Sequence, residues 1–275
     1  AFCRAARGLS RPPAVRFTIF QDVPSDDDGG ACPALLDAIR GERLAGLILP
    51  TPGYWRGALT LEQLPLPVAT LGMGPRAGVH TLVLDNAAFL DRALECLAAR
   101  GRRRIAVLGS HEHRSALGPA GIAAAMDTLG LSFRPSWMIP LSAFMPETGR
   151  AVTRLLFEFA RQRRPDGLII TDDHLLDQVA AGLAAAGVTV GDDLDVVSHC
   201  NWPAPPACEL PVVFLGYDIP EVTRQAVEAI RRRRGGQPVA ATTPVQPVLF
   251  SGVSPATLRL IQTAPNPNGP AATKE

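Results

Sequence analysis

Two apolar, β-rich segments in the middle of the chain each end in a short run of polar residues. The first, Leu168–Ile170, leads through Thr-Asp-Asp into an amphipathic helix, which Asp173 is expected to cap. The second, Leu194–Val197, runs into Ser-His-Cys-Asn-Trp-Pro. Open α/β sheets bind ligands at the carboxyl ends of their strands, so the two polar runs predict a small-molecule pocket.

Much of the chain alternates in a similar way. Strands are predicted at residues 14–21, 44–50, 67–72, 79–84, 103–109, 166–171, 193–198 and 211–215. Helical stripes of apolar residues are predicted at residues 86–100, 116–129, 147–161, 174–186 and 220–233. Strands that alternate with helices build parallel, doubly wound sheets, so the predicted fold class is α/β.

Charge and hydropathy exclude several classes of protein. The formal net charge is +1 and charged residues make up 19% of the chain, so no overall field favours nucleic acid or an anionic membrane. No apolar stretch approaches the ~18 residues of a membrane span, and the N-terminus has no signal-peptide core. We therefore expect a cytoplasmic protein that does not bind membranes.

The five cysteines form no recognisable framework, because their number is odd and none lies in a CxxC pair. Disulfide-built domains and zinc knuckles both need such pairing, so free thiols are expected.

No motif for catalysis is present. The chain has no Walker-type phosphate loop, no GxGxxG that opens a helix, no HExxH and no GxSxG. The arginine runs Arg100–Arg104 and Arg231–Arg234 end helices, where cations offset the helix macrodipole, and they lack the interleaved aromatic residues of a nucleic-acid site. We expect neither an enzyme nor a cofactor, and we interpret both runs as solvated helix ends.

Five segments, taken in order and spacing, resemble the effector-binding domain of lactose/galactose-repressor-type (LacI/GalR) transcription regulators. They are Leu66-Pro-Val-Ala-Thr-Leu, Val83-Leu-Asp-Asn-Ala-Ala, Leu97-Ala-Ala-Arg-Gly-Arg-Arg-Arg-Ile-Ala-Val-Leu-Gly, Arg164-Pro-Asp-Gly-Leu-Ile-Ile-Thr-Asp-Asp and Ala186-Gly-Val-Thr-Val-Gly-Asp-Asp-Leu-Asp-Val-Val-Ser. Each segment is short, but the resemblance covers nearly the whole chain.

The resemblance implies a periplasmic-binding-protein-like fold, in which two α/β subdomains are joined by three crossovers and hold the effector in the cleft between them. Residues 1–84 and 217–246 would then form the N-terminal subdomain, with its first strand missing. Residues 85–216 and 247–258 would form the C-terminal subdomain, and residues 259–275 a flexible tail.

The N-terminus departs from the family pattern. Such regulators begin with a helix-turn-helix DNA-binding headpiece, a hinge helix and the first strand of the sheet. This sequence opens instead on an expected helix, Phe2–Leu9, followed directly by the strand Ala14–Phe20. We expect upstream residues in the natural gene, and operator DNA as a partner only through a headpiece that is absent from this chain.

The residues that usually bind sugars in this family are largely replaced. The corresponding positions read Gly72, Gly118, Asp172-Asp173 and Cys200. Among them, Asp172 is the one polar ligand contact that clearly survives, so the charged, bidentate groups suited to sugar hydroxyls are reduced.

Histidines could supply the polar contacts of the pocket instead. His111, His113 and Arg114 follow one predicted strand, and His199, Cys200 and Asn201 follow another. This grouping is compatible with a metal or pH-sensitive site, because neutral imidazole binds transition metals and titrates near neutrality. We favour the alternative, in which these side chains hydrogen-bond an uncharged ligand or lie solvated on loops, and expect no metal.

Four aromatic residues are candidates for the apolar walls of the pocket. They are Phe144, Trp202, Tyr54 and Trp55. Core packing or a surface loop is an equal alternative for each of them.

The function that the resemblance implies is effector sensing and dimerisation in a bacterial LacI-family regulator. A sugar-like molecule or related metabolite would bind in the cleft of a homodimer and control its binding to DNA. The alternative, a solute-binding protein of an ABC transporter, shares the same fold.

Overall fold

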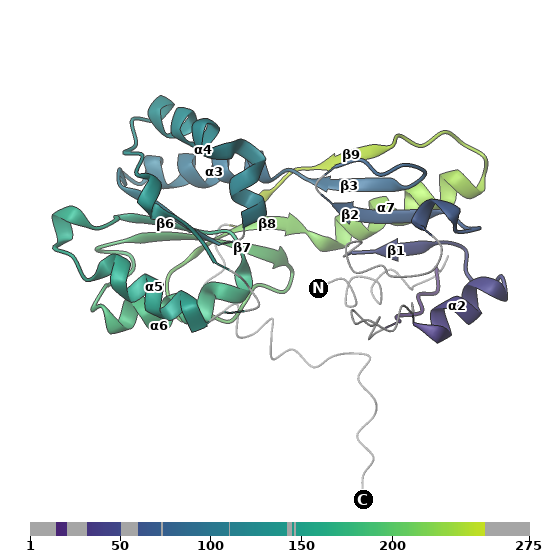
Figure 1. Ribbon diagram of the computed structural model, residues 1–275, viewed down its shortest axis with the longest axis horizontal. Helices are drawn as coiled ribbons and strands as arrows, with labels where there is room; N and C mark the ends of the chain where they lie inside the picture. The colour runs from purple at the N-terminus through teal and green to yellow at the C-terminus, as the bar shows by residue number, and fades with distance from the viewer. Residues whose placement is uncertain are drawn as a thin grey trace, which may run out of the picture. The chain divides into compact units, whose positions relative to one another are not determined.

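The chain divides into two compact units in the computed structural model (Figure 1). The structure describes residues 15–20, 32–50, 60–72, 74–109, 111–141, 145 and 147–250, without the side chains of residues 111–119. The first unit holds the described residues up to Phe89 together with Asn201–Pro203 and Tyr217–Val248. The second unit holds those of Leu90–Cys200, Ala204–Gly216 and the last two described residues. The subdomain boundaries expected from the sequence stay a prediction.

The first unit is built on a four-stranded parallel sheet with the order β1-β2-β3-β9. Its strands are β1 (Leu47–Leu49), β2 (Val68–Gly72), β3 (His80–Leu84) and β9 (Thr242–Val245). Two helices pack on the sheet, α2 (Pro33–Arg40) and α7 (Ile219–Arg234).

The two helices cover opposite faces of this sheet, because neighbouring residues of β2 contribute to different buried clusters. Val68 belongs to the cluster that contains Leu35 and Ile39 of α2. Ala69 belongs to the cluster that contains Val222 of α7. With both faces covered, four consecutive residues of the strand, Val68–Leu71, are buried without alternation, as expected for a doubly wound sheet.

Helix α7 has clear start and stop signals. The side chain of Asp218 caps it by accepting a hydrogen bond from the backbone N–H of Glu221 at 3.2 Å. Pro220 occupies the first turn, where its missing N–H does no harm, and Gly235 follows the last residue. Four arginines fill the last turn, where their charge offsets the macrodipole.

The second unit contains a six-stranded sheet with the order β10-β8-β7-β6-β4-β5. Its strands are β4 (Ile105–Gly109), β5 (Met138–Pro140), β6 (Gly167–Ile170), β7 (Asp195–Trp202), β8 (Val213–Asp218) and β10 (Val248–Phe250). Strands β5, β4, β6 and β7 are parallel neighbours. Strands β7 and β8 both run on into residues of the first unit.

Four α-helices flank this sheet, with α3 and α4 on one side and α5 and α6 on the other (Figure 1). They are α3 (Asn86–Ala99), α4 (His111–Thr128), α5 (Glu147–Phe157) and α6 (Leu176–Ala185). Every residue of β4 and β6 is buried, which confirms the parallel, doubly wound α/β class. No helix in the described ranges is both long and apolar enough to cross a bilayer.

Ion pairs between carboxylates and arginines lie at the end of this sheet where β4, β6 and β7 begin. Arg102 Nε donates to Asp195 Oδ2 at 2.6 Å, and Arg104 Nη2 lies 3.1 Å from Asp166 Oδ2. Arg100 Nη1 also lies 3.2 Å from Asp195 Oδ1, so the run Arg100–Arg104 contains three arginines that are held in ion pairs. The interpretation of this run as a solvated helix end was incomplete, because sequence spacing alone does not reveal the carboxylates that meet it.

Several expectations need correction. Residues 15–20 form no strand, although Phe20 packs against the cluster around α2. Helix α2 and strands β5, β9 and β10 were not expected from the sequence. The expected helix Phe2–Leu9 and the tail from residue 259 lie outside the described residues.

Candidate functional site

The carboxyl ends of β4, β6 and β7 meet at one edge of the second sheet. Leu108 pairs with Ile170, and Ile170 pairs with Ser198. The residues that follow these positions are therefore brought together, as the strand pattern predicted. The tip of β6 continues as Thr171, Asp172, Asp173 and His174, and the tip of β7 as His199 and Cys200.

Asp172 caps the short 3-10 helix Asp173–Leu175 at the tip of β6. Its Oδ1 accepts a hydrogen bond from the backbone N–H of His174 at 3.1 Å and lies 2.9 Å from His174 Nδ1. The sequence interpretation gave the capping role to Asp173, and the structure corrects this. The extended backbone of Asp172, at φ −138° and ψ 117°, is the geometry that an N-cap residue needs.

The carboxylates change the acidity of His174. Its hydrogen bond to Asp172 raises the pKa of the imidazole, partial burial opposes that shift, and the charge of Asp173 adds to it. The protonated form of His174 is therefore favoured while both carboxylates remain ionised.

Asp173 faces a second histidine, which comes from β7. His199 Nδ1 lies 3.8 Å from Asp173 Oδ1, and His174 Nδ1 lies 3.4 Å from the same oxygen. His199 is only 9% exposed, and the side chain of Asp173 is 14% exposed. The ligand atoms of Asp172, Asp173 and His174 all lie within 4.8 Å of one another, so this group could hold a metal ion.

Cys200 is fully buried. Burial raises the pKa of its thiol, and the nearby charge of Asp173 raises it further. A Cβ on Gly216 of β8 would overlap the Cys200 carbonyl, so the two strands approach each other closely at this point. Cys200 is thus a neutral thiol inside the sheet, which explains why its position offers no charged contact.

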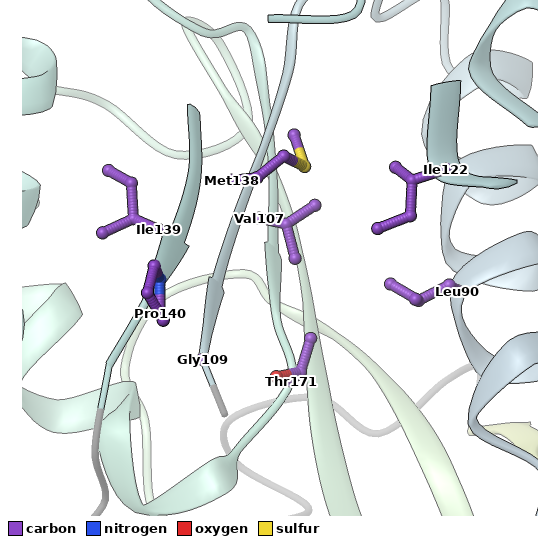
Figure 2. Close-up of a pocket in the computed structure, with 8 residues that line it drawn as sticks. All are labelled: Leu90, Val107, Gly109, Ile122, Met138, Ile139, Pro140 and Thr171. Atoms are coloured by element: carbon purple, nitrogen blue, oxygen red, sulfur yellow. The ribbon is translucent and has the colours of Figure 1, made fainter. Parts of the chain in front are cut away.

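Sequence reasoning missed Gly109 and Thr171, which line a small cavity at this edge (Figure 2). Thr171 is 1% exposed, and its Oγ1 has no hydrogen-bond partner among the described residues. The cavity has a volume of about 10 Å³, roughly the space of one water molecule. Its remaining walls are apolar or proline side chains, namely Leu90, Val107, Ile122, Met138, Ile139 and Pro140.

The structure describes only some of the other predicted site residues. Asn201 and Trp202 end β7 and are half-buried. His111, His113 and Arg114 belong to α4 and not to the expected loop, and their side chains lie outside the described part. Tyr54, Trp55 and Phe144 also lie outside the described residues.

Comparison with known proteins identifies one matching family model, described as a periplasmic binding protein-like domain, over residues 94–253. No curated protein sequence matches the chain.

Solved structures share the fold of nearly the whole chain. A regulatory protein of the LacI family from Chloroflexus aggregans is 24% identical with a TM-score of 0.70, over 90% of this chain and 88% of that protein. A LacI family transcriptional regulator from Bifidobacterium animalis subsp. lactis is 24% identical with a TM-score of 0.64, over 82% and 83%. One from Lactobacillus casei with bound glucose is 22% identical with a TM-score of 0.59, over 79% and 81%.

Proposed function

The chain belongs to the periplasmic binding protein-like domain family, and we propose that it is the effector-sensing and dimerisation domain of a LacI-type transcription regulator. The solved structures that share its fold include LacI-family regulators, one of them with bound glucose. The similarity to these regulators favours a cytoplasmic regulator over a solute-binding protein of a transporter.

The observation that carries the proposal is the set of polar groups at the carboxyl ends of β6 and β7. Asp173 faces His199 and Asp172 binds His174 at the edge where parallel sheets bind their ligands. Carboxylate oxygens and imidazole nitrogens accept hydrogen bonds from hydroxyl groups, so a sugar-like molecule or related metabolite is the class of effector. The other contacts predicted from the sequence remain part of the proposal, namely Asn201, Trp202, His113, Arg114, Phe144, Tyr54 and Trp55.

The effector should depend less on charged partners than a hexose bound by acidic and basic side chains. Gly72 ends β2 without a side chain, and the Cys200 thiol is neutral and buried. Asp172 then becomes the principal anchor among the proposed contacts.

In the proposed regulator, effector binding changes the arrangement of a homodimer, and that change is transmitted to a DNA-binding headpiece. In this proposal, operator DNA is contacted by a helix-turn-helix headpiece. Light scattering at tens of micromolar tests the dimer, because a monomer at that concentration contradicts it.

The effector site is tested by a thermal-shift screen of sugars, sugar acids, nucleosides and aromatic metabolites, followed by calorimetry with each ligand that stabilises the chain. Asp172→Ala should weaken binding about ten- to a hundredfold, which corresponds to about 1–3 kcal/mol.

Two further variants separate binding from folding. Asp172→Asn keeps an oxygen that can cap the 3-10 helix, so it should fold normally and still bind more weakly. Asp127→Ala removes an exposed carboxylate at the end of α4 and should bind like the unaltered chain. Strong stabilisation by a plain hexose that is unaffected by Asp172→Ala contradicts this site.

A further inference from the structure

Three stretches of chain connect the two units, apart from the short excursion of Asn201–Pro203 into the first unit. They cross from unit to unit at Phe89–Leu90, Gly216–Tyr217 and Val248–Leu249, and we call them the first, second and third connection. We propose that side chains of the first unit fasten these three connections to one another, so that they open together as one cooperative hinge.

The residues that fasten them are Asp85, Asn86, Tyr217 and Gln246, which we call the clasp. All four belong to the first unit, and each lies within a few residues of a crossing. The clasp is distinct from the candidate effector site, whose described residues lie at the tips of β6 and β7.

A buried hydrogen bond ties the first connection to the second. The hydroxyl of Tyr217 donates to Asn86 Oδ1 at 3.2 Å. Tyr217 is fully buried and Asn86 is 5% exposed, so water does not compete for this bond as it does at a surface. Burial and the nearby charge of Asp85 raise the pKa of the phenol, which keeps Tyr217 protonated as the donor.

Asp85 ties the first connection to the third. Its backbone N–H donates to the Val245 carbonyl at 3.0 Å. Its Oδ2 accepts a hydrogen bond from Gln246 Nε2 at 2.9 Å. Both partners lie just before the third crossing, so the first connection is bonded to each of the other two.

Asp85 is also bonded to the start of α3. Its Oδ1 accepts a hydrogen bond from the Ala88 N–H at 2.9 Å, and its carbonyl accepts one from the Phe89 N–H at 3.0 Å. Helix α3 begins in the first unit and continues into the second. Because a hydrogen-bonded helix moves as a stiff element, a displacement of α3 reaches Asp85 and, through the clasp, the other two connections.

The clasp adds a means of coupling to the proposed regulator. An effector that displaces one connection would act on all three, because their openings share the same hydrogen bonds. The contacts of the clasp do not depend on which effector binds. The test is therefore made on the chain alone, and its outcome is separate from that of the effector screen.

Hydrogen exchange followed by mass spectrometry measures the opening of each connection. Tyr217→Phe removes the hydroxyl and keeps the ring. We expect exchange at all three connections to become about three- to tenfold faster, because the lost bond opposes the opening of the whole hinge. Gln246→Ala should accelerate exchange at the same three connections by only about twofold, since its bond to Asp85 is exposed to water.

Two matched variants serve as controls. Thr223→Val removes another buried hydroxyl of the first unit, which donates to the Ile219 carbonyl within α7 at 2.7 Å. Gln237→Ala shortens another exposed glutamine, which follows the end of α7. Neither change touches the clasp, so exchange at the three connections should stay as in the unaltered chain. Circular dichroism verifies that each variant keeps its helix content.

The double variant Tyr217→Phe/Gln246→Ala separates one shared opening from independent openings. If both bonds oppose the same opening, the acceleration at every connection is the product of the two single effects. The proposal is overturned if Tyr217→Phe accelerates the second connection alone, if Gln246→Ala accelerates the third alone, or if neither changes exchange. An equal effect of Thr223→Val on the connections also overturns it. If Tyr217→Phe does not fold, Gln246→Ala makes the same comparison from the surface.

Discussion

Gly109 at the end of β4 lies directly against the side chain of Thr171 at the tip of β6. A Cβ on Gly109 would overlap Thr171 Oγ1, and the Gly109 backbone has φ +146°, a conformation that residues with a side chain rarely adopt. Two independent requirements therefore demand glycine at this position. The contact sets how closely the ends of β4 and β6 approach each other beside the candidate site.

Gly109→Ala should destabilise the chain by about 2–3 kcal/mol, because it introduces both backbone strain and the overlap with Thr171. Urea unfolding followed by circular dichroism measures the loss. Gly130→Ala is the matched control, since Gly130 also has a positive φ, +64°, but faces open space; it should cost only about 1 kcal/mol.

Thr171→Ala in the Gly109→Ala background removes the overlapping oxygen and should recover part of the stability. Equal losses in Gly109→Ala and Gly130→Ala, with no recovery in the double variant, would show that the overlap is unimportant.

Asp195→Asn should destabilise the second unit by about 2–4 kcal/mol, because it removes the charge that holds Arg100 and Arg102 at the start of β7. The side chains of Asp195 and Arg102 are 12% and 19% exposed, so solvent screens this ion pair weakly, whereas the pair with Arg100 is more exposed. Asp37→Asn breaks an exposed pair with Arg40 at 3.6 Å and should change stability by less than about 0.5 kcal/mol. Chemical unfolding of both variants at pH 7 makes the comparison, and similar small losses would contradict the structural role of Asp195.

The lowered pKa of Glu221 predicts that the folded chain loses a small part of its stability in acid. Hydrogen bonds from Arg224 and Gln225 lower the pKa of this carboxyl to about 2. Because the folded pKa lies below the unfolded value, the stabilisation is complete above the unfolded pKa, near 4.5, and is lost as the pH falls through about 2. The pair is exposed, so its contribution at pH 7 should be only about 0.3–0.5 kcal/mol.

The stability difference between the unaltered chain and Glu221→Gln should therefore shrink between pH 7 and pH 3. An NMR titration of the Glu221 carboxyl provides the direct measurement. A midpoint near 4.5 would contradict the two hydrogen bonds.

Sequence patterns were sufficient for the elements that bury continuous apolar runs. Strands β4 and β6 and helix α3 were predicted within two residues at each end, since burial on both faces and a glycine stop leave a clear signal. The side-by-side placement of the polar ends of β6 and β7 also followed, because the carboxyl ends of parallel strands share an edge.

The sequence predictions were wrong where strand pairing and register determine the secondary structure. Residues 15–20 are β-rich but have no strand partner in the described part, and propensity alone does not make a strand. Helix α4 begins at His111 although Gly118 and Pro119 disfavour a helix interior. The contact between Gly109 and Thr171 depends on the relative position of two strands, which neither strand encodes by itself.

Cys200 should react with iodoacetamide far more slowly than Cys96. The thiolate is the reactive species, and burial together with the charge of Asp173 raises the pKa of the Cys200 thiol, so little thiolate forms at neutral pH. Cys96 lies on α3 and is half-buried, which makes it the internal reference. Labelling of the folded chain at pH 8, followed by peptide mass spectrometry, gives both rates from one sample. The difference should vanish in about 6 M guanidinium chloride, where burial no longer distinguishes the two thiols. Equal labelling of Cys200 and Cys96 in the folded chain would mean that the end of β7 opens to solvent, and would remove the reason for treating this thiol as neutral.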